Sequence, residues 1–237
     1  MRIATINISG NVGKTTVAKN LLYPRLPGAE IFEIESVNTG IELKAATVRS
    51  LRASSYGKLI DSIMLLESAI VDVGASNVEG FLKEMQELEG SHEDLDYFLI
   101  PVVKDDKIVK ESMKTAVLLS DLGIPESKIK IVFNRFPKDL DVLETFAPIF
   151  RFASSEGRFT VDKSAVIYEN PVYAALNSAQ SSLLELNSDA TDYREALRQA
   201  GDEKQQRAAL AMIANKRRAS SATKNLDEVF ATLFGGI

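Results

Sequence analysis

The chain has 237 residues, 45% of them hydrophobic, and a formal net charge of −5 at pH 7, which fits one α/β domain with a small appendage. It contains no cysteine, so disulfides, thiolate catalysis and cysteine-ligated metal sites are excluded, and a reducing, cytoplasmic location is expected. The acidic balance argues against polyanion binding by the whole surface. No apolar stretch approaches the roughly 18 residues of a membrane helix, so we expect no membrane span.

Apolar, β-rich runs alternate with helical patterns through the first two thirds of the chain. The expected strands cover residues 2–8, 30–34, 68–74, 97–103 and 130–134, with a weaker one over 159–167. The expected helices include one that ends near Tyr23 and others over residues 41–51, 59–65, 78–88 and 108–122. This alternation predicts parallel βαβ units and a sheet that is covered on both faces.

The last third of the chain has a helical pattern from Pro171 onward, with expected breaks at Gly201 and at Ser220–Ser221. Asn225 with Glu228 three residues later is typical of a capping box. That pattern predicts a last short helix, which ends at Gly235.

The segment 9–16 reads Ser-Gly-Asn-Val-Gly-Lys-Thr-Thr and lies between the first expected strand and a helix. Strand, glycine loop and helix in this order are typical of a phosphate-binding loop. Gly10 and Gly13 can adopt positive φ, so that backbone N–H groups converge on an anion at a helix N-terminus. Lys14 can reach the β- and γ-phosphates, and the Thr15 hydroxyl can bind Mg²⁺.

Three acidic residues and one amide lie near the ends of expected strands, which is where open α/β sheets bind ligands. Asp72 ends an apolar run and can hold Mg²⁺ through a water, as a Walker-B acid does; alternatively, it caps a helix. Of Glu33 and Glu35, at most one is expected to face a nucleotide, and either can be a solvated loop carboxylate. Asn134, followed by Arg135, can pair with the edge of a base or complete the strand ladder with a side-chain hydrogen bond.

With these motifs in order, the chain resembles the deviant Walker ATPases of the ParA/MinD group. Within that group it is most similar to the plasmid-encoded StbB-like proteins, whose loop also reads Gly-Asn-Val-Gly-Lys-Thr-Thr. The resemblance covers residues 1–180 and implies a three-layer α/β P-loop NTPase fold with a mainly parallel sheet. It also implies ATP and Mg²⁺ as ligands, an ATP-dependent homodimer, slow hydrolysis and a plasmid-encoded DNA-binding partner protein. The implied role is plasmid partition, stability or conjugative transfer.

The resemblance also implies roles for residues by their position. Nucleotide binding falls on Gly10, Asn11, Val12, Gly13, Lys14, Thr15, Thr16, Asn134, Arg135 and Pro171, and metal binding on Thr15 and Asp72. Lys14, Glu35 and Asp72 are the expected catalytic residues, and Glu35 occupies the position of the acid that orients the attacking water. Two departures are present: Ile8 replaces the first glycine of the usual loop, and the signature lysine of the group falls on Ser9.

Residues 181–237 are expected to form a helical extension that packs on the ATPase domain of residues 1–180. The stretch 204–226 carries six basic side chains and no acid. On one helix, Lys204, Arg207 and Arg218 would share a sector of about 60°. Weak, non-specific DNA binding by Lys204, Arg207, Lys216, Arg217 and Arg218 is one interpretation, and a solvated helix face is the other.

Two other functions remain open on the sequence alone. The same fold can serve a small-molecule kinase or an ATP-dependent ligase, which needs a second polar pocket for an acceptor. It can also serve a nucleotide-binding adaptor that never hydrolyses ATP.

Overall fold

The computed structural model describes residues 1–35 and 48–235. In these residues a seven-stranded sheet has the order β3-β2-β4-β1-β5-β6-β7, and all neighbouring strands are parallel. The strands are β1 (Arg2–Thr5), β2 (Glu30–Ile34), β3 (Val48–Leu51), β4 (Ala69–Val73), β5 (Tyr97–Val102), β6 (Ile129–Phe136) and β7 (Val166–Tyr168). The predicted parallel α/β sheet is confirmed. The weak strand predicted over 159–167 is present only as β7 and a single bridge between Lys130 and Thr160.

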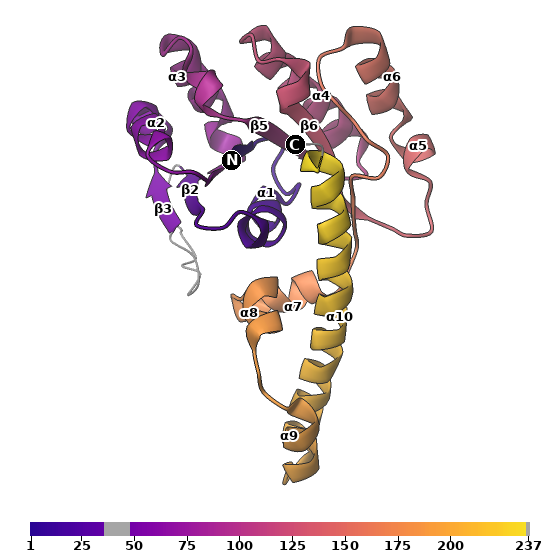
Figure 1. Ribbon diagram of the computed structural model, residues 1–237. Helices are drawn as coiled ribbons and strands as arrows, with labels where there is room; N and C mark the ends of the chain where they lie inside the picture. Colours follow the sequence, from indigo (N-terminus) through magenta and orange to yellow (C-terminus); the bar gives the residue numbers. More distant parts are fainter. Residues whose placement is uncertain (36–47, 236–237) are drawn as a thin grey trace.

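Helices cover both faces of this sheet, so the fold has three layers (Figure 1). The helices on one face are α2 (Tyr56–Met64), α3 (Val78–Glu87), α4 (Asp106–Asp121) and α6 (Ala147–Glu156), with the short α5 (Val142–Thr145) before α6. Those on the other are α1 (Lys14–Thr16) with its continuation to Arg25, α7 (Val172–Ala179), α8 (Leu183–Ser188) and part of α10 (Glu203–Phe234). Strand side chains alternate between the two buried clusters, which explains the nearly continuous apolar runs in the sequence.

The helix predicted over residues 41–51 is wrong at its C-terminal end. Residues 41–47 lie outside the described part of the chain, and residues 48–51 form the edge strand β3. Val48 pairs with Ile31 and Leu51 with Ile34 in parallel register. The side chains of β3 are half-buried or exposed, so the strand carries no apolar run of its own, and pairing with β2 overrides the local spacing.

The C-terminal helix α10 is continuous over 32 residues. The break predicted at Gly201 is confirmed, because α9 (Tyr193–Gln199) ends before it and α10 begins after it. The break predicted at Ser220–Ser221 and the cap at Asn225 are wrong. The Asn225 side chain accepts a hydrogen bond from the Tyr168 backbone N–H at 3.0 Å and donates to the Val166 carbonyl at 2.9 Å. Asn225 therefore completes the edge of β7, not a helix end.

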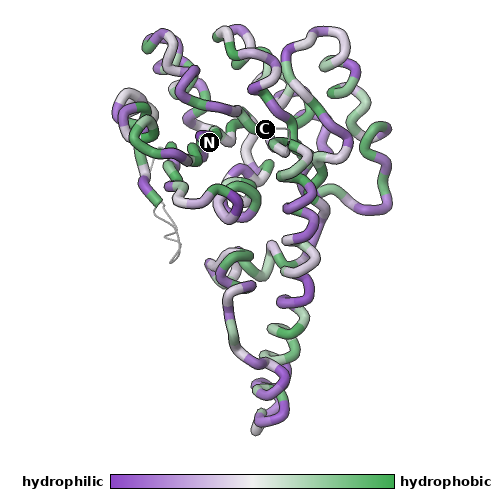
Figure 2. Tube along the Cα trace, in the orientation of Figure 1, coloured by the Kyte–Doolittle hydropathy of each residue, from purple (hydrophilic) through white to green (hydrophobic). Residues whose placement is uncertain are grey.

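The two halves of α10 have different surroundings. Its C-terminal half carries buried residues from Ala219 to Phe234, which join the same cluster as the helix after the glycine loop. Its N-terminal half projects away from the sheet with α9 beside it (Figure 1). The tip of this projection is hydrophilic (Figure 2). We call the segment 189–218 the projection. No helix in the described residues is long and apolar enough to cross a membrane.

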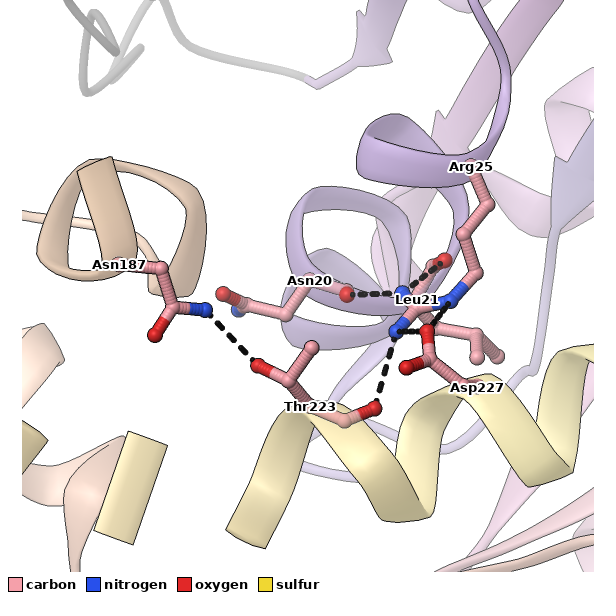
Figure 3. A network of polar contacts seen from close by, with 6 residues as sticks. All are labelled: Asn20, Leu21, Arg25, Asn187, Thr223 and Asp227. Atoms are coloured by element: carbon pink, nitrogen blue, oxygen red, sulfur yellow. Dashed lines mark hydrogen bonds and ion pairs between the residues drawn. The ribbon is translucent and has the colours of Figure 1, made fainter. Parts of the chain in front are cut away.

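A polar network ties α10 to the helix that follows the glycine loop (Figure 3). The Arg25 guanidinium donates to the Asn20 and Leu21 carbonyls at 3.0 and 2.9 Å, at the C-terminal end of that helix. It also donates to the Thr223 carbonyl at 3.2 Å and to the Asp227 carboxylate at 2.9 Å. Arg25 is mostly buried, so this junction fixes α10 against the helix that follows the glycine loop.

Candidate functional site

The strand register places a row of polar side chains at the carboxyl end of the sheet. Thr5 lies opposite Asp72, and Asp72 lies opposite Glu33. Thr5, Asp72, Glu33 and, on β6, Asn134 each come two positions after an apolar residue that packs under the helix following the glycine loop. These apolar residues are, in the same order, Ile3, Ile70, Ile31 and Val132. Because side chains alternate along a strand, the polar row faces the same helix. Four separate segments thereby converge beside the start of α1.

The glycine loop is held by an amide from β6, two strands away from β1, on the same face of the sheet. Gly13 has φ +86°, and a Cβ at this position would lie 2.3 Å from Asn134 Nδ2, so only glycine fits. The Asn134 amide donates to the Val12 carbonyl at 2.8 Å and is almost fully buried. Asn11 also has a positive φ, of +57°, a conformation that asparagine tolerates better than most residues. A Cβ on Gly10 would meet open space.

Lys14 lies inside this loop. Its ammonium donates to the Asn7 carbonyl at 3.0 Å and to the Ser9 carbonyl at 2.8 Å. Burial lowers the pKa of Lys14 to about 8, while the Asp72 carboxylate acts in the opposite direction. The ammonium is thus close to the loop backbone, where an anion would be bound.

Asp72 and Thr15, the two predicted metal-binding residues, lie together. The Asp72 carboxylate accepts hydrogen bonds from the Thr15 hydroxyl and, at 2.9 Å, from the Thr5 hydroxyl. Burial raises the pKa of Asp72, and these two hydroxyls counteract the rise. A carboxylate and a hydroxyl are oxygen donors of the kind that Mg²⁺ prefers, so the residues present fit this ion.

The two acids at the end of β2 differ in their surroundings. Glu33 is buried and forms an ion pair with Lys19 at 3.0 Å, a contact that the sequence did not indicate. Glu35 is half-buried, and its backbone N–H donates to the Leu51 carbonyl at 3.1 Å. The Glu33 carboxylate is therefore paired with a lysine. The water-positioning role of Glu35 stays a prediction.

A cavity of about 560 Å³ adjoins the glycine loop on the side of β6 and α7. Its lining includes Thr16, Asn134, Arg135, Tyr168, Pro171 and Asn177, which brings Pro171 close to the predicted phosphate residues. Its size suits a nucleoside next to a phosphate loop. The base contact of Asn134 stays a prediction. Its amide nitrogen donates to the Val12 carbonyl, and its amide oxygen accepts from the Arg135 N–H.

Ser9, at the position of the expected signature lysine, is also buried and bonded. Its hydroxyl donates to the Glu111 carboxylate of α4, and its N–H donates to Asn7 Oδ1 at 2.8 Å. The contacts of Ser9 with Glu111 and of Asn134 with Val12 join residues from distant parts of the chain, and that of Lys19 with Glu33 joins two consecutive elements. The sequence contains no local signal for them, except that Asn134 and Glu33 follow their apolar neighbours at the spacing of one strand face.

The basic residues proposed for DNA do not form one uniform patch. Arg207 forms an ion pair with Glu203 one turn earlier on α10. Lys216 lies over the Tyr193 ring, 5.3 Å from its centroid, and donates to the Asp189 carbonyl. Lys204, Arg217 and Arg218 remain exposed. The Arg218 carbonyl accepts from Asn170 at 3.2 Å, so this end of the basic stretch lies near the 560 Å³ cavity, which Asn170 also lines.

Comparisons with known proteins identify the fold. No protein-family model and no curated protein sequence matches the chain. Among solved structures, the MinD cell division protein of Aquifex aeolicus aligns with TM-score 0.56 and 14% identity, over 93% of this chain and 96% of that one. MinD with Mg-ADP from Pyrococcus horikoshii OT3 gives 0.55 and 14%, over 96% and 95%. The pnob8 ParA structure gives 0.52 and 12%, over 100% and 99%. The chain therefore has the three-layer fold of the ParA/MinD-type P-loop ATPases.

Proposed function

We propose that the protein is an ATP- and Mg²⁺-dependent molecular switch, a weak ATPase that acts in plasmid partition, stability or conjugative transfer. The observation that carries this proposal is the glycine loop, closed at Gly13 by Asn134 and placed beside Lys14, Thr15 and Asp72. The fold shared with MinD and ParA structures supports it. MinD from Pyrococcus horikoshii OT3, which has this fold, is described as a complex with Mg-ADP.

The site can act mainly by positioning and charge neutralisation. Backbone N–H groups of the loop and the Lys14 ammonium would bind the phosphates, and the 560 Å³ cavity would hold the nucleoside against Pro171. Thr15 and Asp72 would hold Mg²⁺, which neutralises phosphate charge when bound. Glu35 would orient the attacking water. We expect turnover to be slow, because Ser9 supplies no charge where the resembling group has a lysine.

The switch would act through assembly. We propose that ATP favours a homodimer and that a plasmid-encoded DNA-binding protein stimulates hydrolysis, as the resemblance implies. Lys204, Arg217 and Arg218, exposed on the projection, could add weak and non-specific contacts to DNA phosphates.

Binding of ATP to a Lys14→Ala variant tests the proposal. Without the ammonium only backbone donors remain, so we expect ATP affinity in calorimetry to fall by about 100-fold or more. Lys83→Ala, which removes an exposed lysine on α3, is the matched control and should bind ATP like the wild type. Unchanged binding by Lys14→Ala would refute the assignment of the phosphate loop.

Turnover assays distinguish the switch from the two other functions. Hydrolysis that is stimulated by DNA or a protein, with no other substrate, supports the switch. Turnover that requires a small-molecule acceptor would instead identify a kinase or ligase. ATP that stays intact in single-turnover assays would identify a non-hydrolysing adaptor.

A further inference from the structure

Arg135 has an unusual backbone conformation at the carboxyl end of β6. Its φ is +52°, in the left-handed region that non-glycine residues rarely occupy. The pairing between β6 and β7 shifts in register between Phe133 and Phe136, on either side of it. The Asn134 side chain accepts a hydrogen bond from the Arg135 N–H at 3.0 Å. Such outliers persist where the surroundings hold them, and they cluster at ligand sites.

This conformation places the Arg135 side chain over the glycine loop. Its Nη2 atom lies 3.8 Å from the position that a Cβ on Gly13 would occupy. Asn134, the preceding residue, is fixed to the same loop through the Val12 carbonyl. The guanidinium therefore extends from a segment that is bonded to the loop, and it reaches the first residue before α1.

The Arg135 charge has no protein partner in the described ranges 1–35 and 48–235. Its side chain is exposed and its guanidinium makes no hydrogen bond or ion pair there, beside a loop in which Gly10 and Asn11 are exposed as well. The other nearby cations differ: Lys19 is paired with Glu33, and Lys14 donates to two loop carbonyls. Ser9, on the α4 side of the loop, is uncharged and bonded to Glu111.

We propose that the Arg135 guanidinium binds the phosphate chain of the nucleotide, as a second side-chain cation beside Lys14 in the same subunit. This inference rests on the proposed function. A guanidinium presents several N–H donors in one plane and can bind two phosphate oxygens at once. Arg135 also lines the 560 Å³ cavity proposed for the nucleoside, but its Nη2 atom lies 3.8 Å from the Cβ position on Gly13, a residue of the phosphate loop, and this proximity favours the phosphates as its ligand.

The test compares ATP with inorganic tripolyphosphate, which has the phosphates but no nucleoside. Arg135→Ala should weaken both ligands by a similar factor, roughly 10–100-fold, because both lose the same charge-assisted hydrogen bonds. Arg135→Lys should recover part of the loss, since lysine keeps the charge but not the planar arrangement of donors. Arg135→Gly, which suits the positive φ, should behave like Arg135→Ala and excludes misfolding as the cause.

Arg151→Ala is the matched control, because Arg151 is exposed on α6, which packs on the opposite face of the sheet. It should bind both ligands like the wild type. Weakened ATP binding with unchanged tripolyphosphate binding would place the guanidinium on the base and overturn the proposal, as would unchanged binding of both ligands. Lys14→Ala, measured in parallel, tests the proposed function separately. If Lys14→Ala loses ATP binding while Arg135→Ala binds ATP normally, the phosphate loop stands and only the role of Arg135 is refuted.

Discussion

The carboxyl end of the sheet and the projection both carry many polar side chains, but they use them in different ways. At the sheet, buried side chains bond across long sequence distances, as Asn134 does with Val12 and Ser9 with Glu111. In the projection, exposed charges pair within one helical turn, as Arg207 does with Glu203. Exposed pairs of this kind contribute little to stability, whereas an unpaired buried polar group is costly. We therefore expect substitutions in the buried pairs to be costly and substitutions in the exposed pairs to be tolerated.

The largest difference between the two regions should come from adding one methyl group to a glycine in each. In Gly13→Ala the new Cβ would meet Asn134 Nδ2 and take a strained φ, which we expect to cost about 1–3 kcal/mol of stability and most ATP affinity. In Gly201→Ala the nearest atom, Gln205 Oε1, lies 3.8 Å away, and neither property should change. Thermal unfolding and calorimetry measure both effects. Equal changes in stability and ATP affinity in the two variants would contradict this difference between the two regions.

The acids of the site should separate binding from turnover. Glu35→Gln keeps the shape of the side chain but removes the carboxylate proposed to orient water, so ATP should bind and persist. Asp72→Ala removes a proposed Mg²⁺ ligand and should abolish Mg²⁺-dependent hydrolysis. Single-turnover assays with labelled ATP follow both. Asp189→Ala in the projection serves as the control and should hydrolyse ATP normally. If Glu35→Gln hydrolyses ATP at the wild-type rate, another group positions the water.

A smaller effect is expected from restoring a charge at Ser9. A cation supplied from another subunit to a transferring phosphoryl group can accelerate the reaction by about 10³–10⁵ in related systems. We expect slow wild-type turnover, which Ser9→Lys should raise by about tenfold or more; the buried position and the neighbouring Glu111 carboxylate limit the gain. ATPase rates per molecule over a wide protein concentration range test this. A fast wild-type rate with no gain would mean that another cation acts here.

The smallest effect is expected in the projection itself. Replacing Lys204, Arg217 and Arg218 by alanine should weaken duplex DNA binding and reduce the salt slope of log K by about 2.7, for three lost phosphate contacts. Arg207→Ala removes a cation that is already paired with Glu203 and should change the slope less. Fluorescence anisotropy across a salt series measures both. DNA binding that survives replacement of Lys216 and Arg207 as well would place the contacts elsewhere.

The parts of the fold that sequence predicted correctly are those with a local cause. The central strands β1, β2, β4, β5 and β6 each carry a buried apolar run. The edge strand β3 has no buried residue, so its sequence could not be told from a helix. The sequence predicts two helices where α10 is continuous, because Asn225 bonds to Val166 and Tyr168, which lie 59 and 57 residues earlier in the chain. Such a contact is invisible to local pattern analysis.

The same division holds at the site. Gly13, Lys14 and Thr15 follow from one short motif, and Asp72 from the end of an apolar strand, and the structure brings them together. The residues that hold this motif in place lie far away in the sequence. Asn134 is 122 residues from its partner Val12, and Glu111 is 102 residues from its partner Ser9. Tertiary packing decides these pairs, so they had to be observed. The roles of Glu35 and Pro171 stay predictions.

Because α10 is one continuous helix, a rotation of its anchored half would also move its far end. Asn225 fixes the helix to the sheet edge and Arg25 fixes it to the glycine-loop helix, while the opposite end packs against α9. At 1.5 Å per residue, the start of α10 lies about 33 Å from Asn225. A rotation of about 10° at this fulcrum would carry the far end through about 6 Å. A small rotation of α10 beside the glycine loop would thus become a larger displacement at the tip of the projection.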